Sequence, residues 1–204
     1  MDKLCIIFRG LNWRRRPEGL VDPMPFVGNW QQYIFSDLDK HGITYDTVFI
    51  TYPSQVLEDL CYLIEPKIVI TEGYDSQMSN LRFVADWMAE HRFEYNKFII
   101  LRFDFWYKIP ITQWPLFEED GFILINKDVS WEQTFYISDF LFQIGSESVQ
   151  SFKHIINKPI WIPHEIGACL KLEGTPHKYM YKDYYYYSKD HPMYSYFLDP
   201  MPKP

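Results

Sequence analysis

Short apolar runs alternate with amphipathic segments over the first 104 residues of the chain. Runs rich in β-branched and aromatic residues predict strands, whereas apolar residues three or four positions apart predict helices. The predicted strands are Leu4–Phe8, Tyr45–Thr51, Lys67–Thr71 and Phe98–Phe103. The predicted helices are a segment capped by Asn29 and ending near Gly42, then Gln55–Ile64, then Met78–His91. Such alternation indicates βαβ units and a mostly parallel sheet.

The pattern becomes mixed in the second half of the chain. Two segments rich in proline, glycine or aromatic residues predict irregular structure: Leu11–Gly28 and the tail from Tyr179 onwards. The other expected elements are a strand at Gly121–Asn126, a strand or extended lead-in at Thr134–Leu141, a helix at Ser146–Ile156 capped by Ser146, and a helix at Pro163–Leu172. We therefore expect one α/β domain over residues 1–204, with a mostly parallel half in 1–108 and a mixed α+β half in 109–204.

Polar residues that directly follow the predicted strands are the first candidates for a site. In open α/β sheets, ligands bind beyond the carboxyl ends of the strands. The first strand ends in Arg9-Gly10, where a guanidinium can meet a phosphate and a glycine lets a ligand approach the backbone. A surface arginine followed by a turn glycine explains the same pair equally well.

The loop after the third strand leads into a helix. Asp75 or Ser76 can cap that helix, and the capping role suits Ser76 best. Asn80 and Arg82 fall on its first turns, from which they can reach back toward a nucleotide or its phosphates. Asp75, Asn80 and Arg82 are therefore candidate nucleotide-binding residues.

The fourth strand carries the strongest local signal. Arg102 and Asp104 stand at alternate positions after an apolar run, so both lie on one face of the strand. Charged side chains beside a buried strand need either a partner of opposite charge or a functional role that explains their burial. One interpretation is an Arg102–Asp104 ion pair. The other is that Asp104 holds a divalent cation that neutralises a diphosphate, since Mg²⁺ and Mn²⁺ prefer oxygen ligands.

Composition and charge narrow the function classes. The formal net charge is −7, whereas a protein that binds duplex DNA through its phosphates is normally basic, so we expect no nucleic-acid partner. No window approaches a transmembrane span, and the apolar run at the amino terminus ends at Arg9, too soon for a signal peptide. Three widely spaced cysteines favour a reducing compartment. The expected location is the cytoplasm.

Several segments resemble one enzyme family. They are CIIFRG, DSQMSNLRFVADWM with FIILRFDFWYK, YISDFLFQIGSESVQSFKHI, PHEIGACLKLEG and YYYYSKDHPMYSY. Together they are similar to the small GT-A-type glycosyltransferases of bacterial polysaccharide clusters and large DNA viruses. The resemblance implies a GT-A-like sheet, a nucleoside diphosphate sugar as donor and a glycan or another hydroxyl compound as acceptor.

The resemblance also implies roles for individual residues. Asp104 matches the acidic motif that holds Mn²⁺ or Mg²⁺ on the donor, with Arg102 standing where the first aspartate of that motif would be. Either Arg102 takes over part of the phosphate neutralisation or Asp104 binds the metal alone. His191 matches a closing motif and is a second metal or diphosphate contact. Asp139 is the first candidate for the catalytic base and Glu165 the second.

Each of these residues also has a structural interpretation. Asp139 can cap a helix or stabilise a turn, Glu165 suits the dipole of a first helical turn, and His191 can be an ordinary loop residue. The function itself has an alternative, a non-catalytic carbohydrate- or nucleotide-binding protein. The sequence contains no P-loop, dinucleotide-binding, serine-hydrolase or zinc-protease motif that would favour another enzyme class.

Overall fold

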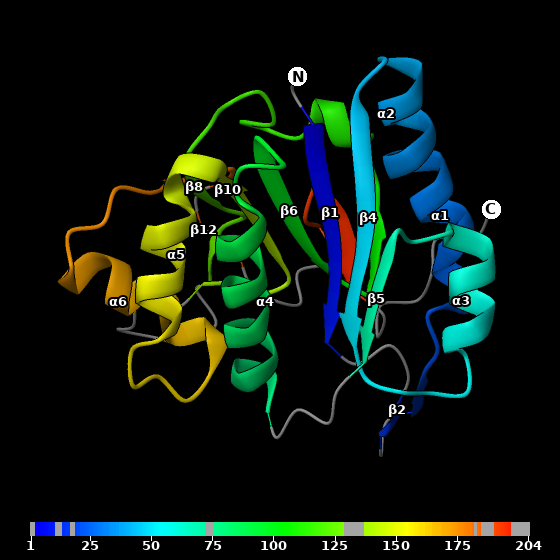
Figure 1. Cartoon of the computed structure of the whole chain (residues 1–204), viewed down its shortest axis with the longest axis horizontal. Helices are drawn as coiled ribbons and strands as arrows, with labels where there is room; N and C mark the ends of the chain where they lie inside the picture. Colours follow the sequence, from blue (N-terminus) through cyan, green and yellow to red (C-terminus); the bar gives the residue numbers. More distant parts are fainter. Residues whose placement is uncertain are drawn as a thin grey trace.

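A seven-stranded sheet flanked by helices organises the chain (Figure 1). The structure is a computed structural model, and it describes residues 3–10, 14–16, 19–71, 76–128, 137–181, 183–184 and 190–196. The strand order is β11-β8-β10-β6-β1-β4-β5. The expectation of an α/β fold is therefore confirmed, and the strands of 109–204 continue the sheet begun in 1–108.

The four strands expected in the first half form a continuous parallel block in this sheet. Their apolar side chains are almost all buried at the centre, because helices cover both faces. β1 pairs in parallel with both β4 and β6, and β4 pairs in parallel with β5. The bounds are β1 Lys3–Gly10, β4 Thr44–Thr51, β5 Ile68–Thr71 and β6 Lys97–Arg102.

The second half adds three strands to the sheet and takes part in two small sheets, one of which joins it to the first half. β10 runs antiparallel to both β6 and β8, and β11 is parallel to β8. Because β10 is antiparallel, its first residue, Leu141, lies opposite Leu101 near the carboxyl end of β6. The bounds are β8 Phe122–Leu124, β10 Leu141–Gly145 and β11 Lys178–Tyr179, with β12 Asp183–Tyr184 pairing with β9 Lys127–Asp128, and β13 Tyr194–Tyr196 pairing with β7 Phe105–Tyr107.

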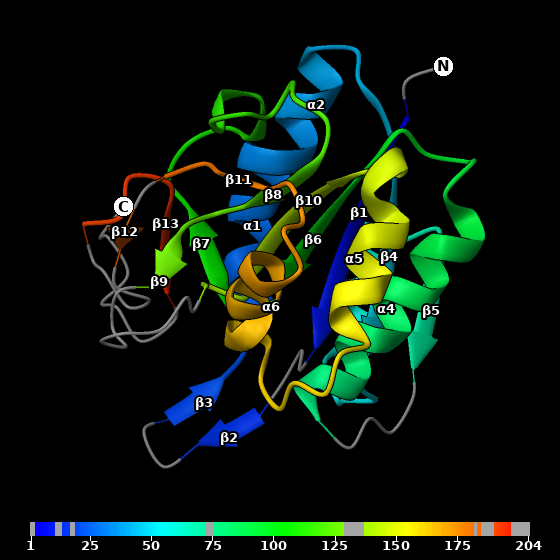
Figure 2. The same cartoon turned by 90° about the vertical axis from the view of Figure 1, so that its left-hand side faces the viewer.

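The helices lie on opposite faces of the sheet (Figure 2). One apolar cluster joins α1, α2 and α3 to the side chains of Ile6, Phe8 and Phe49, and a second joins α4, α5 and α6 to Ile7 and Ile100. The α-helices are α1 Val27–Trp30, α2 Ser36–Lys40, α3 Leu57–Ile64, α4 Gln77–His91, α5 Val149–Ile156 and α6 Ile166–Leu172. A π-helical turn at Gln31–Phe35 joins α1 to α2, and short 3-10 turns are Met24–Phe26, Ile111–Gln113, Ser146–Ser148 and Pro163–Glu165.

Local expectations were wrong at three places. The segment Leu11–Gly28, expected to be a long loop, contains a hairpin of β2 Arg14–Arg16 and β3 Gly19–Val21. The helix expected to begin after Asn29 begins earlier, at Val27. Asn29 therefore caps nothing; instead its side-chain amide forms two hydrogen bonds with the backbone of Tyr107. Ser146 begins a 3-10 turn and makes no side-chain cap.

The expectation of an irregular tail was also wrong in part, because Asp183–Tyr184 forms β12 and Tyr194–Tyr196 forms β13. Of the expected strand or lead-in at Thr134–Leu141, residues 134–136 lie outside the described residues, and Ile137 forms an isolated bridge with Lys127. The cap at Ser76 is confirmed, since its hydroxyl accepts from the Ser79 amide. In the described part of the chain, every helix is too short or too polar to cross a membrane.

Candidate functional site

The parallel strands reverse their direction of progression between β1 and β6. From β1 the chain moves outward to β4 and β5, then returns to place β6 on the other side of β1. This is the order of the doubly wound folds, in which ligands bind outside the carboxyl ends of the strands at the switch point. Arg9 and Arg102 are direct register neighbours at this point, one from each strand.

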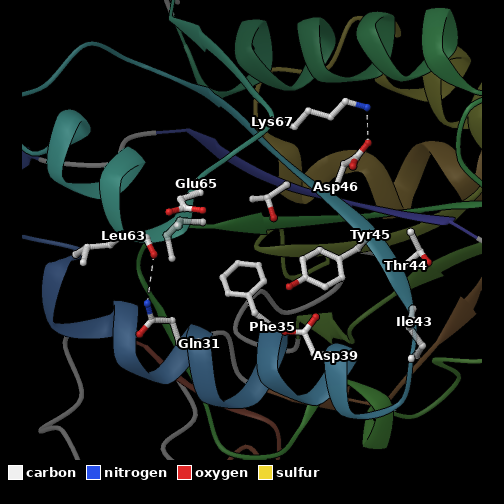
Figure 3. Close-up of a pocket in the computed structure, with 13 residues that line it drawn as sticks. Gln31, Phe35, Asp39, Ile43, Thr44, Tyr45, Asp46, Leu63, Glu65 and Lys67 are labelled. Atoms are coloured by element: carbon white, nitrogen blue, oxygen red, sulfur yellow. Dashed lines mark hydrogen bonds and ion pairs between the residues drawn. The ribbon is translucent and has the colours of Figure 1, made fainter.

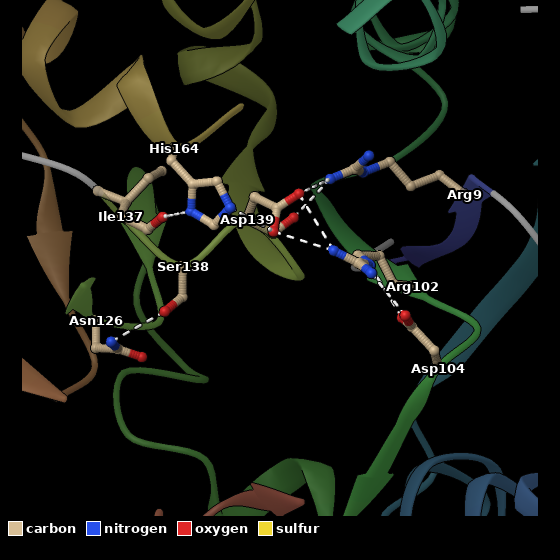
Figure 4. A network of polar contacts seen from close by, with 8 residues as sticks. All are labelled: Arg9, Arg102, Asp104, Asn126, Ile137, Ser138, Asp139 and His164. Carbon is tan, nitrogen blue, oxygen red and sulfur yellow. Dashed lines mark hydrogen bonds and ion pairs between the residues drawn. The ribbon is translucent and has the colours of Figure 1, made fainter. Parts of the chain in front are cut away.

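Arg102 holds the carboxylates of two aspartates (Figure 4). Its Nε and Nη2 donate to the two carboxylate oxygens of Asp104 at 2.9 and 2.6 Å, in the bidentate geometry that suits a guanidinium. Its Nη1 donates to Oδ1 of Asp139 at 3.1 Å. Asp104 is 3% exposed. The ion pair that the sequence offered as one interpretation of Arg102 and Asp104 is therefore present.

Arg9 approaches Asp139 from the neighbouring strand. Its Nη2 donates to the backbone carbonyl of Asp139 at 2.5 Å and lies 3.5 Å from Oδ2 of the same residue. Arg9 is 1% exposed and Asp139 is fully buried. Gly10, which ends β1, has a φ of +85°, a conformation that side chains disfavour, and its carbonyl accepts from the Thr51 hydroxyl at 2.7 Å.

His164, which the sequence did not single out for a role, completes the group. Its Nδ1 lies 2.7 Å from the Ile137 carbonyl, and because a carbonyl only accepts, the proton of the neutral ring belongs on Nδ1. Its Nε2 lies 3.8 Å from Oδ1 of Asp139. The imidazole is more exposed than either aspartate. We refer to Arg9, Arg102, Asp104, Asp139 and His164 as the charged network.

The residues expected to hold a metal are engaged with other groups. Both Asp104 oxygens accept from Arg102. His191 lies against the rings of Tyr181 and Tyr194, and its Nδ1 accepts from the Met193 amide at 3.2 Å. Burial, helped by the charge of Lys108, lowers the pKa of His191 to about 3. Among the described residues, no group of three metal-ligating side chains gathers at one place.

The other candidate residues hold the structure together elsewhere. Asn80 is buried, and its amide donates to the Ile50 carbonyl, which ties α4 to β4. Arg82 donates to backbone carbonyls between α5 and α6. Glu165 accepts from the amides of Trp161 and Ile162. Asp75 lies outside the described residues.

Two clefts lie at the opposite, amino-terminal edge of the strands, and no residue of the charged network lines either of them. The larger, about 660 Å³, lies between the α1–α2 helix, the end of α3 and the beginnings of β4 and β5 (Figure 3). The smaller, about 540 Å³, includes Lys97, whose ammonium donates to the Phe117 carbonyl. Burial lowers the pKa of Lys97.

Asp46, at the edge of the larger cleft, gives a prediction about stability at low pH. Its carboxylate accepts from Lys3, Lys67 and Tyr95 at 2.6–2.7 Å. Burial alone would raise its pKa, but these hydrogen bonds outweigh burial and lower the pKa to about 2. A depressed carboxyl pKa stabilises the fold above its unfolded value near 4, and that stabilisation is lost as the pH falls to 2.

We expect Asp46→Asn to remove about 1–2 kcal/mol of this acid-dependent stability, a figure reduced for solvent screening. Urea unfolding between pH 2 and pH 6 measures it. Asp86→Asn is the matched control, because Asp86 makes one ion pair, with Lys153, on the surface. An unchanged pH slope in Asp46→Asn would contradict the assignment.

Comparison with known proteins adds no relative. No protein-family model matches the chain, and no curated protein matches it either.

Proposed function

We propose that the chain is a cytoplasmic glycosyltransferase of GT-A-like architecture, which moves a sugar from a nucleoside diphosphate sugar to a glycan or another hydroxyl acceptor. The observation that carries the proposal is that Arg9 and Arg102 lie side by side on neighbouring strands at the switch point of the sheet. Guanidiniums match the geometry of phosphate oxygens, and a diphosphate would bind here by taking over donors that now serve Asp104 and Asp139, since both arginines are buried.

The chemistry asks for positive charge where the bond breaks. As the acceptor oxygen attacks the anomeric carbon, the bond from that carbon to the diphosphate breaks, and its electron pair stays on the phosphate. Fixed cationic groups stabilise this developing negative charge. Asp139 orients both guanidiniums through its backbone carbonyl and its carboxylate. In this proposal the arginines, rather than a metal on Asp104, supply the positive charge.

The acceptor must also lose a proton. The sequence favoured Asp139 as the base, but this aspartate is fully buried. His164 is the more accessible member of the pair, and its Nε2 faces Asp139. We therefore place proton acceptance on Nε2 of His164, with Asp139 stabilising the imidazolium that forms. Glu165, whose carboxylate is bonded to two backbone amides, has no part in this step.

The non-catalytic alternative is favoured by one observation. Asp104 and Asp139 are both buried and paired with arginines, an arrangement that also serves a purely structural purpose. A protein that only binds a nucleotide or carbohydrate would keep this network without using it for chemistry. The two functions differ in whether the donor is consumed.

A thermal-shift screen of UDP-, GDP- and dTDP-sugars, with and without Mn²⁺, tests the proposal. A donor at about 100 times its Kd adds about 2.7 kcal/mol to the stability, which raises the Tm of a chain of this size by roughly 5–10 °C. We expect at least one donor to do so without Mn²⁺. No shift at millimolar concentration would overturn the proposal, and a shift seen only with Mn²⁺ would overturn its metal-free form. A donor that binds but is never consumed would support the alternative.

A further inference from the structure

We propose that Trp161 is a stacking platform for a pyranose ring of the acceptor glycan. Its description as an acceptor subsite rests on the proposed function, whereas the platform itself rests on the local structure. Trp161 is 86% exposed, although Trp30, Trp87 and Trp114 are buried in the core. So large an exposed aromatic surface adds little to the stability of the fold, because little of it is removed from water.

The connection that carries Trp161 is fixed by Arg82. The guanidinium donates to the backbone carbonyls of Ile156, Lys158 and Ile160, at 3.3 Å each. A single arginine on α4 thus binds three carbonyls on one side of the connection. Since buried or half-buried carbonyls need donors, this contact defines the path of the chain up to Trp161.

Glu165 fixes the other side. Its Oε2 accepts from the amide of Trp161 at 2.7 Å and from the amide of Ile162 at 3.4 Å. Trp161 is therefore held between an arginine before it and a glutamate after it. Because the backbone is fixed, only the torsions of the indole side chain remain to be ordered when a ligand stacks on it, which favours binding.

The connection lies on the charged network's side of the sheet. In Figure 1 it runs at the lower end of the molecule, where the arrowheads of β1 and β4 also point. His164 follows three residues after Trp161, so their Cα atoms are within about 11 Å of one another. His164 in turn contacts Asp139. In the proposal, one hydroxyl of the glycan lies at His164 and a neighbouring ring lies on Trp161.

A neutral sugar suits this place better than a nucleotide. The chain has a net charge of −7, and Glu165 puts a carboxylate directly behind the Trp161 backbone. The local carboxylate disfavours a ligand that carries phosphates at this place, whatever the chain binds elsewhere. An exposed aromatic face instead suits the apolar face of a neutral pyranose ring. We therefore assign neutral oligosaccharides as the ligand class.

The test measures oligosaccharide binding without any donor. Wild type and Trp161→Ala are titrated with maltohexaose, cellohexaose and chitohexaose, with ligand NMR as the readout. We expect wild type to bind at least one of them and Trp161→Ala to bind it at least 10-fold more weakly, with Trp161→Phe in between. Phe93→Ala is the matched control, because Phe93 is 88% exposed but lies between α4 and β6, and it should leave binding unchanged.

A second variant separates the platform from a general effect on folding. Arg82→Gln keeps Trp161 but removes the charged donor, so we expect weaker binding that Arg82→Lys restores in part. When transfer is measured, both Trp161→Ala and Arg82→Gln should raise KM for the acceptor and leave kcat within a few-fold of wild type.

Three results would overturn the inference: no hexasaccharide bound by wild type, equal binding by Trp161→Ala, or a change of oligomeric state in Trp161→Ala that points to a protein interface instead. Its failure is distinct from failure of the proposed function. If sugar binding depends on Trp161 but no donor binds, the stacking platform is supported and the transferase function is rejected. If the donor is turned over but sugar binding does not depend on Trp161, the transferase function is supported and the stacking platform is rejected.

Discussion

Replacing Arg102 with methionine is expected to lower the free energy of unfolding by about 3–5 kcal/mol. Arg102 donates hydrogen bonds of 2.6–3.1 Å to the carboxylates of both Asp104 and Asp139, and both aspartates are buried. Removing one partner of a buried ion pair leaves a charge that neither water nor protein compensates, which is far more costly than losing the attraction itself. For a chain of this size the Tm should fall by roughly 10 °C.

A double substitution tests whether the loss comes from the stranded charge. Arg102→Met combined with Asp104→Asn removes the charge that has lost both of its hydrogen bonds, so we expect it to recover a large part of the stability. Urea unfolding of the two single variants and the double variant gives the coupling. If the double variant is as unstable as the sum of the two single variants, Arg102 and Asp104 are independent, and the ion pair contributes nothing specific.

The parallel half of the fold could be predicted because its signals are local. Each strand there is a short apolar run such as Phe98–Leu101, buried on both faces, and each helix has an apolar stripe. The hairpin at 14–21 and the pairing of β13 with β7 lack such signals. β13 pairs with a strand some ninety residues earlier, and contacts at this separation follow from packing, not from local propensity.

The candidate site was predictable to a similar extent. The alternation of Arg102 and Asp104 predicted two charges on one strand face. Their ion pair is present, although β6 ends at Arg102 and Asp104 lies in the turn that follows. The meeting of Asp139 with Arg9 and Arg102 joins β1, β6 and the residues before β10, so only the sheet order reveals it. Arg82 was predicted to bind a nucleotide and Glu165 to be the second candidate base, but both bind backbone groups instead. A charged side chain near a helix start can serve either purpose, and the sequence does not distinguish them.

Replacing Arg9 with methionine is expected to reduce transfer by about 10²–10³-fold, the usual cost of removing one fixed donor from developing negative charge. Methionine keeps much of the apolar volume, and Asp139 keeps its hydrogen bond from Arg102, so the fold should survive the change. The readout is kcat for donor consumption, with circular dichroism to confirm folding. Arg92→Met is the control, because Arg92 lies over the exposed ring of Phe93 and away from the network.

Arg9→Lys separates charge from geometry at the same position. Lysine keeps the positive charge but offers a point charge in place of a planar fork, so it should restore only part of the lost rate. Full restoration would mean that charge alone matters at the end of β1. Donor consumption by Arg9→Met within about threefold of wild type would remove Arg9 from the mechanism. The argument from two neighbouring arginines at the switch point would then fail as well. Arg102 would be the remaining arginine there, and it already donates to two carboxylates.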